Sequence, residues 1–305
     1  MCEVEKRARD FYRLSTWNVR SLNEPGKLSN VLKEMIRMEI NILGISETFW
    51  NGEGDFIETV PGTTDRFRII YSGGEKKRRG VCMILREKEG NSVLSYRLIS
   101  DRIMVVRLKA SPVNLLVVQV YAPCEDSSDQ EKENFYETLD QVIKENQKGR
   151  ECLIVMGDFN GRVGCLKEAD TVGPFGLGAR SENGQFIVDL CMSHNLFVTN
   201  SWFQQKRSAQ HSWVSPDGKT KNQIDYILSD KRFRNGVRNS KAMPGADCGS
   251  DHNPIVMTIG IKLRRVKRSK VRVKWKTDEL KDVVKRRRGN RTDLEQIEGV
   301  CYRCC

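Results

Sequence analysis

The clearest structural signal in the chain is Cys152-Leu153-Ile154-Val155-Met156-Gly157-Asp158-Phe159-Asn160. Its first five residues form a short apolar run, which predicts a buried β-strand. A glycine, an acid and an amide follow, so this strand delivers Asp158 and Asn160 to its carboxyl end. An Asp-x-Asn sequence is also common in turns, so this segment alone fits a structural role as well as a functional one.

Polar residues stand at the ends of several other predicted strands. Open α/β sheets bind ligands in the crevice outside the strand ends, so these residues together predict a single site. Acids, amides and one imidazole suit metal-assisted attack on a phosphate. Taken singly, each could be a turn former, a cap or a core residue; their joint occurrence favours function. They are Asn18 after residues 14–17, Glu47 after residues 42–46, Tyr121 after residues 115–120, Asp225 within residues 223–227, and Asp251 and His252 before residues 255–261.

Many short strands and few helices alternate along the chain. The predicted helices cover residues 27–38, 128–145 and 183–194, where apolar residues recur at helical spacing. A regular βαβ repeat would need a helix after nearly every strand, so the pattern predicts an α/β protein with mixed sheets. We expect a four-layer α/β sandwich, with two mixed β-sheets flanked by helices. The predicted strands are residues 14–19, 42–46, 67–71, 81–85, 103–108, 115–120, 152–156, 196–199, 210–214, 223–228 and 255–261.

Positive charge is concentrated near the carboxyl end of the 305-residue chain. Residues 262–288 hold fourteen Lys and Arg against three acids, which is +11 of the total net charge of +12. This asymmetry predicts an N-terminal arm at residues 1–10, one domain at residues 11–262 and a basic tail at residues 263–305. The tail could contact a polyanion such as DNA, or it could simply be a solvated end.

Composition predicts a protein that works away from membranes. The charged fraction is 30% and the mean hydropathy is −0.53, and no apolar run approaches the roughly 18 residues that span a bilayer. Met1–Asp10 shows no secretory signal, so the ten cysteines are interpreted as reduced thiols. We expect a nuclear protein, with the cytoplasm as the alternative, and a monomer.

The polar motifs, in order, resemble those of the endonuclease/exonuclease/phosphatase superfamily, over about residues 11–262. The surroundings of Asp158 and His252 are also similar to endonuclease domains of RTE-type non-LTR retrotransposons, and to craniofacial development protein 2-like proteins derived from such elements. The motifs are Thr16-Trp17-Asn18-Val19-Arg20, Ser46-Glu47-Thr48, Val120-Tyr121-Ala122-Pro123, Gly157-Asp158-Phe159-Asn160, Ile224-Asp225-Tyr226 and Ser250-Asp251-His252.

The resemblance implies a Mg²⁺-dependent DNA endonuclease that leaves 3′-hydroxyl and 5′-phosphate ends. Glu47 would bind Mg²⁺, with Mn²⁺ as an alternative, helped by Asn18 and Asp251. Mg²⁺ prefers oxygen ligands and keeps several waters, which suits a site with few protein carboxylates.

The remaining motif residues would act on the phosphate and the attacking water. Asp158 would orient or deprotonate the water, and Asn160 would donate its amide to a phosphate oxygen. His252, oriented by Asp225, would stabilise the developing charge or assist proton transfer, and Tyr121 would hydrogen-bond the scissile phosphate.

Four residues are candidates for contact with the substrate. Lys77 and Arg78 lie in a basic, glycine-containing loop at residues 72–80, which is either an exposed hairpin or a phosphate-binding loop. Ser212 stands where related endonucleases often carry a small hydroxyl, and Trp213 could stack on a sugar or base or belong to the core.

Two residues depart from repair enzymes of the superfamily, and two alternative functions stay open. Arg20 stands where an abasic-site nuclease has an Asp, and Cys124 stands where many members have an Asn. The alternatives are a catalytically silent, domesticated DNA- or chromatin-binding protein and a phosphatase acting on a small phosphate ester. In an ancestral element, a reverse transcriptase would be the partner of the endonuclease.

Overall fold

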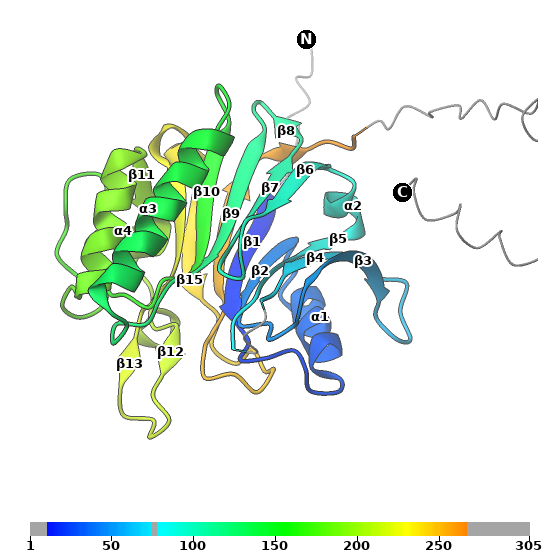
Figure 1. Cartoon of the computed structure of the whole chain (residues 1–305), viewed down its shortest axis with the longest axis horizontal. Helices are drawn as coiled ribbons and strands as arrows, with labels where there is room; N and C mark the ends of the chain where they lie inside the picture. The colour runs from blue at the N-terminus through cyan, green and yellow to red at the C-terminus, as the bar shows by residue number, and fades with distance from the viewer. Residues whose placement is uncertain (1–10, 75–77, 267–305) are drawn as a thin grey trace, which may run out of the picture. The chain divides into compact units, whose positions relative to one another are not determined.

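Two large mixed β-sheets form the centre of the computed structural model, which describes residues 11–74 and 78–266 (Figure 1). The first sheet runs in the order β15 (Val237–Ala242), β16 (Ile255–Gly260), β1 (Phe11–Asn18), β2 (Ile42–Ser46), β5 (Val81–Arg86), β4 (Arg66–Ser72), β3 (Glu53–Thr59). The second runs in the order β11 (Leu196–Val198), β14 (Asp225–Asp230), β10 (Cys152–Asp158), β9 (Leu115–Tyr121), β7 (Ile103–Leu108), β6 (Val93–Leu98).

Short strands and helices complete the described residues. Two small ribbons pair β12 (Trp213–Val214) with β13 (Lys221–Asn222), and β8 (Ala110–Ser111) with β17 (Lys262–Leu263). The helices are α1 (Lys27–Arg37), α2 (Glu87–Gly90), α3 (Asp129–Asn146), α4 (Glu182–Ser193), and the 3₁₀ turns η1 (Thr199–Ser201), η2 (Arg207–Ala209), η3 (Lys231–Gly236). Among these, no helix is long and apolar enough to cross a membrane.

Three apolar clusters separate four layers. The cluster between the sheets includes Leu14 from one sheet and Ile154 from the other. On the outer face of the first sheet, α1 contributes Leu32 and Met35 to a second cluster. On the outer face of the second sheet, α3 and α4 contribute residues such as Leu139 to a third. The predicted four-layer α/β sandwich is therefore confirmed, with helices outside both sheets (Figure 1).

Strand register brings the predicted motif residues together. The parallel pair β1–β2 aligns Asn18 with Ser46, the residue before Glu47. The parallel pair β9–β10 aligns Tyr121 with Asp158, and antiparallel β14 places Asp225 opposite Asp158. Neighbouring strands lie about 4.8 Å apart, so these pairings alone set the side chains within reach of one another.

Most predicted elements agree with the structure within one or two residues, but not all. The predicted strand at residues 210–214 is reduced to the two-residue β12, because a turn at Gln210, directly after η2, and a bend at Ser212 take its first part. The sequence prediction missed β3, β6 and β15. The side chains of β3 and β6 are mostly exposed, so neither strand needs the apolar run by which buried strands are found.

The ordered fold continues beyond the boundary that the sequence predicted at residue 262. There β17 pairs with β8, and Val266 N–H then donates to the carbonyl of Asn91. Backbone pairing, which composition does not reveal, therefore holds residues 262–266 to the sandwich. The rest of the predicted tail, the arm at residues 1–10 and Lys77 lie outside the described residues.

Candidate active site

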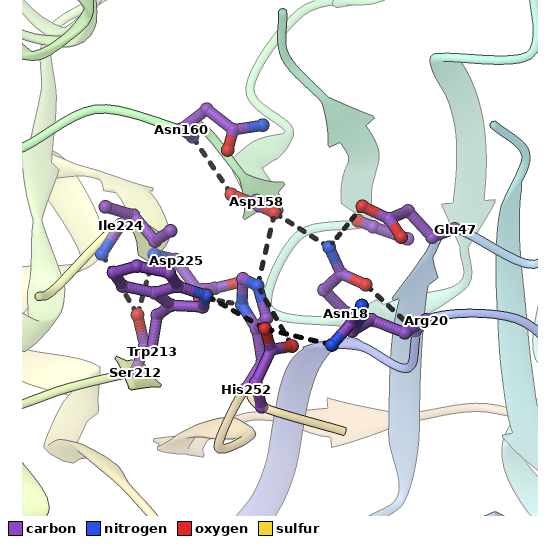
Figure 2. A network of polar contacts seen from close by, with 12 residues as sticks. Asn18, Arg20, Glu47, Asp158, Asn160, Ser212, Trp213, Ile224, Asp225 and His252 are labelled. Carbon is purple, nitrogen blue, oxygen red and sulfur yellow. Dashed lines mark hydrogen bonds and ion pairs between the residues drawn. The ribbon is translucent and has the colours of Figure 1, made fainter. Parts of the chain in front are cut away.

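One pocket of about 560 Å³ collects the strand-end residues. Eight of the predicted site residues line it, and Asp225 lies directly behind His252. Figure 2 shows these side chains converging from both sheets on a common centre. The lining consists of Asn18, Arg20, Glu47, Tyr121, Cys124, Glu125, Asp158, Asn160, Gly161, Arg162, Trp213, Asn222, Ile224, Asp251 and His252.

Asp158 lies at the centre of this network. The side-chain amide of Asn18 donates to Asp158 Oδ2 at 2.9 Å, and the backbone N–H of Asn160 donates to Asp158 Oδ1 at 2.9 Å. Burial and the neighbouring carboxylate of Asp225 outweigh the nearby His252 and raise the pKa of Asp158 to about 7. A carboxyl group with that pKa can take up a proton at neutral pH, which is what a general base must do.

His252 and Asp225 form a buried pair next to Asp158. His252 Nδ1 lies 2.9 Å from Asp225 Oδ2, and His252 Nε2 lies 4.0 Å from Asp158 Oδ2. Burial disfavours the imidazolium, but the facing carboxylates, Asp225 first, prevail and raise the pKa of His252 to about 9. The imidazole ring is therefore a cation at neutral pH, with Nε2 directed towards Asp158.

Glu47 is held at the opposite side of the pocket. Its Oε1 accepts hydrogen bonds from Asn18 Nδ2 at 2.9 Å and from the Tyr121 hydroxyl at 2.8 Å. Burial and the charge of Glu47 raise the pKa of Tyr121 above its usual value, so the phenol stays neutral and donates. Tyr121 thus contacts Glu47, while the sequence analysis expected it to contact the phosphate.

Asn18 presents a donor to the carboxylates, which differs from its predicted role as a metal ligand. The backbone N–H of Arg20 donates to Asn18 Oδ1 at 3.0 Å, so this oxygen must point towards Arg20. The Nδ2 group then faces Glu47 and Asp158. In this arrangement the Asn18 amide nitrogen positions two carboxylates, while its oxygen accepts from the Arg20 backbone.

Asp251 makes contacts that the sequence analysis missed. Its Oδ2 accepts from Trp213 Nε1 at 3.1 Å and pairs with Arg20 at 3.3 Å. Its buried Oδ1 has no hydrogen-bond partner among the described residues and lies 4.0 Å from His252 Nε2. Trp213, which lines the pocket, therefore holds Asp251 through its indole N–H, and Arg20 pairs with the same oxygen.

Ser212 is not a substrate contact. It is fully buried, and its hydroxyl accepts the backbone N–H groups of Ile224 and Asp225, each at 3.0 Å. Ser212 therefore fixes the start of β14, and with it Asp225 (Figure 2). Of the two predicted loop cations, Arg78 is exposed, and Lys77 lies outside the described residues.

Non-glycine residues with left-handed backbone gather at this site. Arg20, Glu47 and Asn160 have φ of 48°, 59° and 47°. Such conformations cost free energy and persist only where the surroundings fix them. Asn160 is fixed by its side chain, which donates to the carbonyl of Ala122 at 3.0 Å, and by Asn183, which donates to the carbonyl of Asn160 at 2.9 Å. A buried Asn at the start of a helix, such as Asn183, is the signal that the sequence analysis passed over.

The pocket offers two groups of potential metal ligands. The ligand atoms of Asp158, Asp225 and His252 all lie within 4.8 Å of one another, and all three residues are buried. His252 Nδ1 and Asp225 Oδ2 already bind each other at 2.9 Å, so this group has fewer open ligand atoms for an ion. Glu47 is half-buried and lines the pocket, and its carboxylate is the kind of ligand that a hard cation prefers.

Comparison with known proteins decides the family. A model of the endonuclease/exonuclease/phosphatase family matches residues 15–252. The chain belongs to this family. The matched range begins within β1 and ends at His252, so it contains every residue described above as forming the pocket network.

Two proteins that are similar to this chain in sequence share one name. The chain is 39% identical to craniofacial development protein 2 of Bos taurus and 38% identical to that of Tragulus javanicus. Each match extends over 257 residues, which is 84% of this chain. The match spans less than half of those proteins, 42% and 43% of their lengths.

Solved structures share the fold at low sequence identity. The endonuclease domain of TRAS1, a telomere-specific non-LTR retrotransposon, is 14% identical with a TM-score of 0.56, covering 82% of this chain and 98% of that domain. The Xenopus laevis APE2 catalytic domain is also 14% identical, with a TM-score of 0.60 and coverage of 84% and 94%. At these identities the similarity establishes the α/β sandwich alone.

Proposed function

We propose that this chain is a divalent-metal-dependent DNA endonuclease, derived from a retrotransposon, that leaves 3′-hydroxyl and 5′-phosphate ends. One observation carries the proposal: buried Asp158 and the His252–Asp225 pair face each other, 4.0 Å apart, in the pocket that Glu47 also lines. A general base, a positively charged imidazole ring and a carboxylate that can bind a metal ion, all lining one pocket, suit phosphodiester hydrolysis.

Each residue has a defined part in this proposal. Asp158 orients a water and accepts its proton, and Asn18 and the Asn160 backbone hold the carboxylate in place. The imidazolium of His252 stabilises negative charge on the phosphoryl oxygens, and Asp225 keeps that ring charged and oriented. The Asn160 amide keeps one N–H free for a phosphate oxygen, since a single bond to Ala122 uses the other.

Glu47 is the proposed anchor for a divalent cation, with Mg²⁺ or Mn²⁺ as the fitting ions. Its Oε1 is steadied by two donors, and Asp251 Oδ1 provides a further buried oxygen without a partner among the described residues. When bound, the cation supplies Lewis-acid polarisation of the scissile phosphate.

Retrotransposon origin and DNA as substrate rest on relatives and on charge. The TRAS1 endonuclease domain, from a non-LTR retrotransposon, shares the fold, and a reverse transcriptase is the partner that we propose for the ancestral element. The basic carboxyl-terminal residues add a phosphate-seeking segment. We also propose that the protein acts in the nucleus and as a monomer. Binding DNA without cleaving it is the alternative, but retention of Glu47, Asp158 and His252 argues against a decayed site.

A substrate panel with end analysis tests this proposal. The purified chain should nick supercoiled plasmid in Mg²⁺, and DNA ligase should reseal the nicks, because ligase requires 3′-hydroxyl and 5′-phosphate ends. Phosphate release from inositol phosphates should stay at background. DNA binding without nicks would favour the silent alternative, and phosphate release from small esters without nicks would favour the phosphatase.

A further inference from the structure

A second pocket opens two residues after Glu47 and has no part in the mechanism above. It has a volume of about 490 Å³ and is named here the aromatic pocket. Four aromatic side chains and two amides line it: Asn23, Phe49, Trp50, Asn51, Phe56 and Tyr71.

Three of the rings form a mutually packed wall. Trp50 meets Tyr71 edge-on at a centroid distance of 4.9 Å, and Phe56 lies 6.2 Å from Trp50 and 6.3 Å from Tyr71. Phe56 is 37% exposed, and Trp50 and Tyr71 are half-buried. Rings that fix one another's orientation form a stacking surface that needs little reordering when a planar ligand arrives.

The backbone that aims Glu47 into the active site also aims Phe49 at the aromatic pocket. Phe49 has φ of 58°, an outlier for a bulky residue, and Glu47 has φ of 59°. Three hydrogen bonds fix this segment: Ser21 N–H to the Glu47 carbonyl at 2.7 Å, Phe49 N–H to the Arg79 carbonyl at 2.9 Å, and Asn23 Nδ2 to the Phe49 carbonyl at 3.1 Å. Hydrogen bonds hold this segment in its strained conformation, so residues 47 and 49 line the two pockets from one rigid segment.

Chain geometry makes the two pockets neighbours. The Cα atoms of Glu47 and Phe49 lie at most about 7 Å apart, because two residues span no more than that. The two side chains add to this separation, so a strand whose phosphate lies at Glu47 passes the aromatic pocket within a few nucleotides.

We propose that the aromatic pocket binds one unstacked nucleobase of the cleaved strand, within a few nucleotides of the scissile phosphate. This inference rests on the proposed endonuclease function. Aromatic rings stack on any base, and the amides of Asn23 and Asn51 match the donors and acceptors of base edges.

One exposed cation stands beside the residues that hold this pocket. Gly73 packs against Trp50 so closely that a Cβ at residue 73 would lie 1.8 Å from the Trp50 carbonyl oxygen. The carbonyl of Arg79 accepts the Phe49 N–H, and the Arg79 guanidinium pairs with Asp101 and Glu131. Its neighbour Arg78 is exposed, and such a charge suits the phosphates of a bound single strand.

A fluorescence experiment on the full chain tests the inference. After the nick position is mapped, 2-aminopurine is placed in turn at each base around it, and binding is measured in Ca²⁺ to prevent cleavage. The wild-type chain should quench one position, within a few nucleotides of the nick, more than its neighbours. Trp50→Leu should abolish that quenching and weaken binding about tenfold.

Matched variants separate stacking from misfolding. Trp50→Phe retains a ring and should retain the quenching, and Phe56→Leu should reduce it. Phe11→Leu, an exposed aromatic on β1 outside the pocket, should change nothing. If wild-type chain nicks DNA but quenches all positions alike, or if Trp50→Leu quenches as wild type does, the inference is wrong and the proposed function stands. If wild-type chain neither binds nor nicks DNA, both are overturned.

Discussion

At the scale of single residues, the site works through opposite charges that burial has brought close together. Asp158 and His252 are both buried, and each sets the protonation of the other. His252 in turn depends on Asp225, whose place is fixed by Ser212. The chemistry therefore belongs to the group of residues and not to any one of them.

Removing Asp158 and His252 together should cost little more than removing either alone. Asp158→Ala and His252→Ala should each lower the single-turnover nicking rate by about 10²–10⁴-fold, because both act on the same phosphate in one step. The double variant should lie within about tenfold of the slower single variant. If the fold losses in rate of the two single variants multiply in the double variant, the two residues serve separate steps.

Glu89 provides a residue-scale test of stability against pH. Its side chain is buried, and Oε2 has no hydrogen-bond partner among the described residues, so burial raises the pKa of this carboxyl above its usual value. A raised folded pKa means that Glu89 stabilises the fold at acidic pH and loses that contribution as pH rises through the folded pKa.

Glu89→Gln should therefore gain stability over wild type as pH rises. Chemical unfolding should give the variant an advantage of about 1 kcal/mol at pH 8 that shrinks towards pH 4. Glu87→Gln, on the same helical turn but exposed, is the control and should show no such trend. An advantage that is constant with pH, or that grows on acidification, would contradict this interpretation of Glu89.

Sequence identified the residues of the site better than their contacts. Asn18, Glu47 and Asp158 were predicted because each follows an apolar run. Strand register brings Asn18 beside Glu47, and packing of the two sheets brings Asp158 to them. The orientation of Asn18 was not predictable, since it depends on one backbone N–H of Arg20 in a left-handed conformation. The burial of Ser212 likewise depends on a loop folding over β14.

At the scale of elements, two parallel strand pairs place the active site. The pair β1–β2 carries Asn18 and Glu47, and the pair β9–β10 carries Tyr121 and Asp158, each from a different sheet. Because parallel neighbours end at the same edge, each pair presents its side chains together. Close approach of β9 and β10 is therefore a condition for the site.

Gly157 is the residue that permits this approach. A Cβ at residue 157 would lie 2.0 Å from the carbonyl oxygen of Val120, so one strand must move. Gly157→Ala should destabilise the fold by about 1–3 kcal/mol and lower nicking more than stability alone explains, because Asp158 moves with its strand. Gly260→Ala on β16, where the nearest atom to a Cβ is at 3.5 Å, is the matched control. Equal melting temperatures for the two variants would contradict this role of Gly157.

Buried elements were predictable, and exposed ones were not. The strands β2 and β7 were predicted to the residue because their apolar runs are fully or mostly buried. The strand β15 mixes small and polar residues, and β3 and β6 lie at sheet edges with exposed side chains. Such strands are held mainly by backbone hydrogen bonds, which leave little trace in composition.

At the scale of the whole molecule, charge and chemistry occupy different parts of the chain. Every residue of the active-site network lies before residue 253, whereas residues 267–305 hold thirteen Lys and Arg against six acids, a net charge of +7. We expect that segment to provide affinity for DNA that does not depend on sequence, without a part in catalysis.

A chain ending at Val266 should separate the two roles. It keeps the last described backbone hydrogen bond, so it should melt as the full chain does. Its DNA affinity should fall, and the slope of log affinity against log salt should become shallower by about 0.9 for each phosphate that is no longer neutralised. Cleavage at saturating DNA should stay within about twofold. A folded truncation with an unchanged salt slope would show that the segment does not contact phosphates.

The most direct test of the account is the rate at which the purified full chain relaxes supercoiled plasmid under single-turnover conditions. The account predicts nicking in Mg²⁺, no nicking in EDTA, and a loss of at least about a hundredfold in Asp158→Asn, which preserves shape and removes the base. Equal melting temperatures of wild type and Asp158→Asn would confirm that the loss is chemical. Nicking that persists in EDTA, or that Asp158→Asn leaves unchanged, would contradict the central claim that this pocket hydrolyses phosphodiesters with a divalent metal.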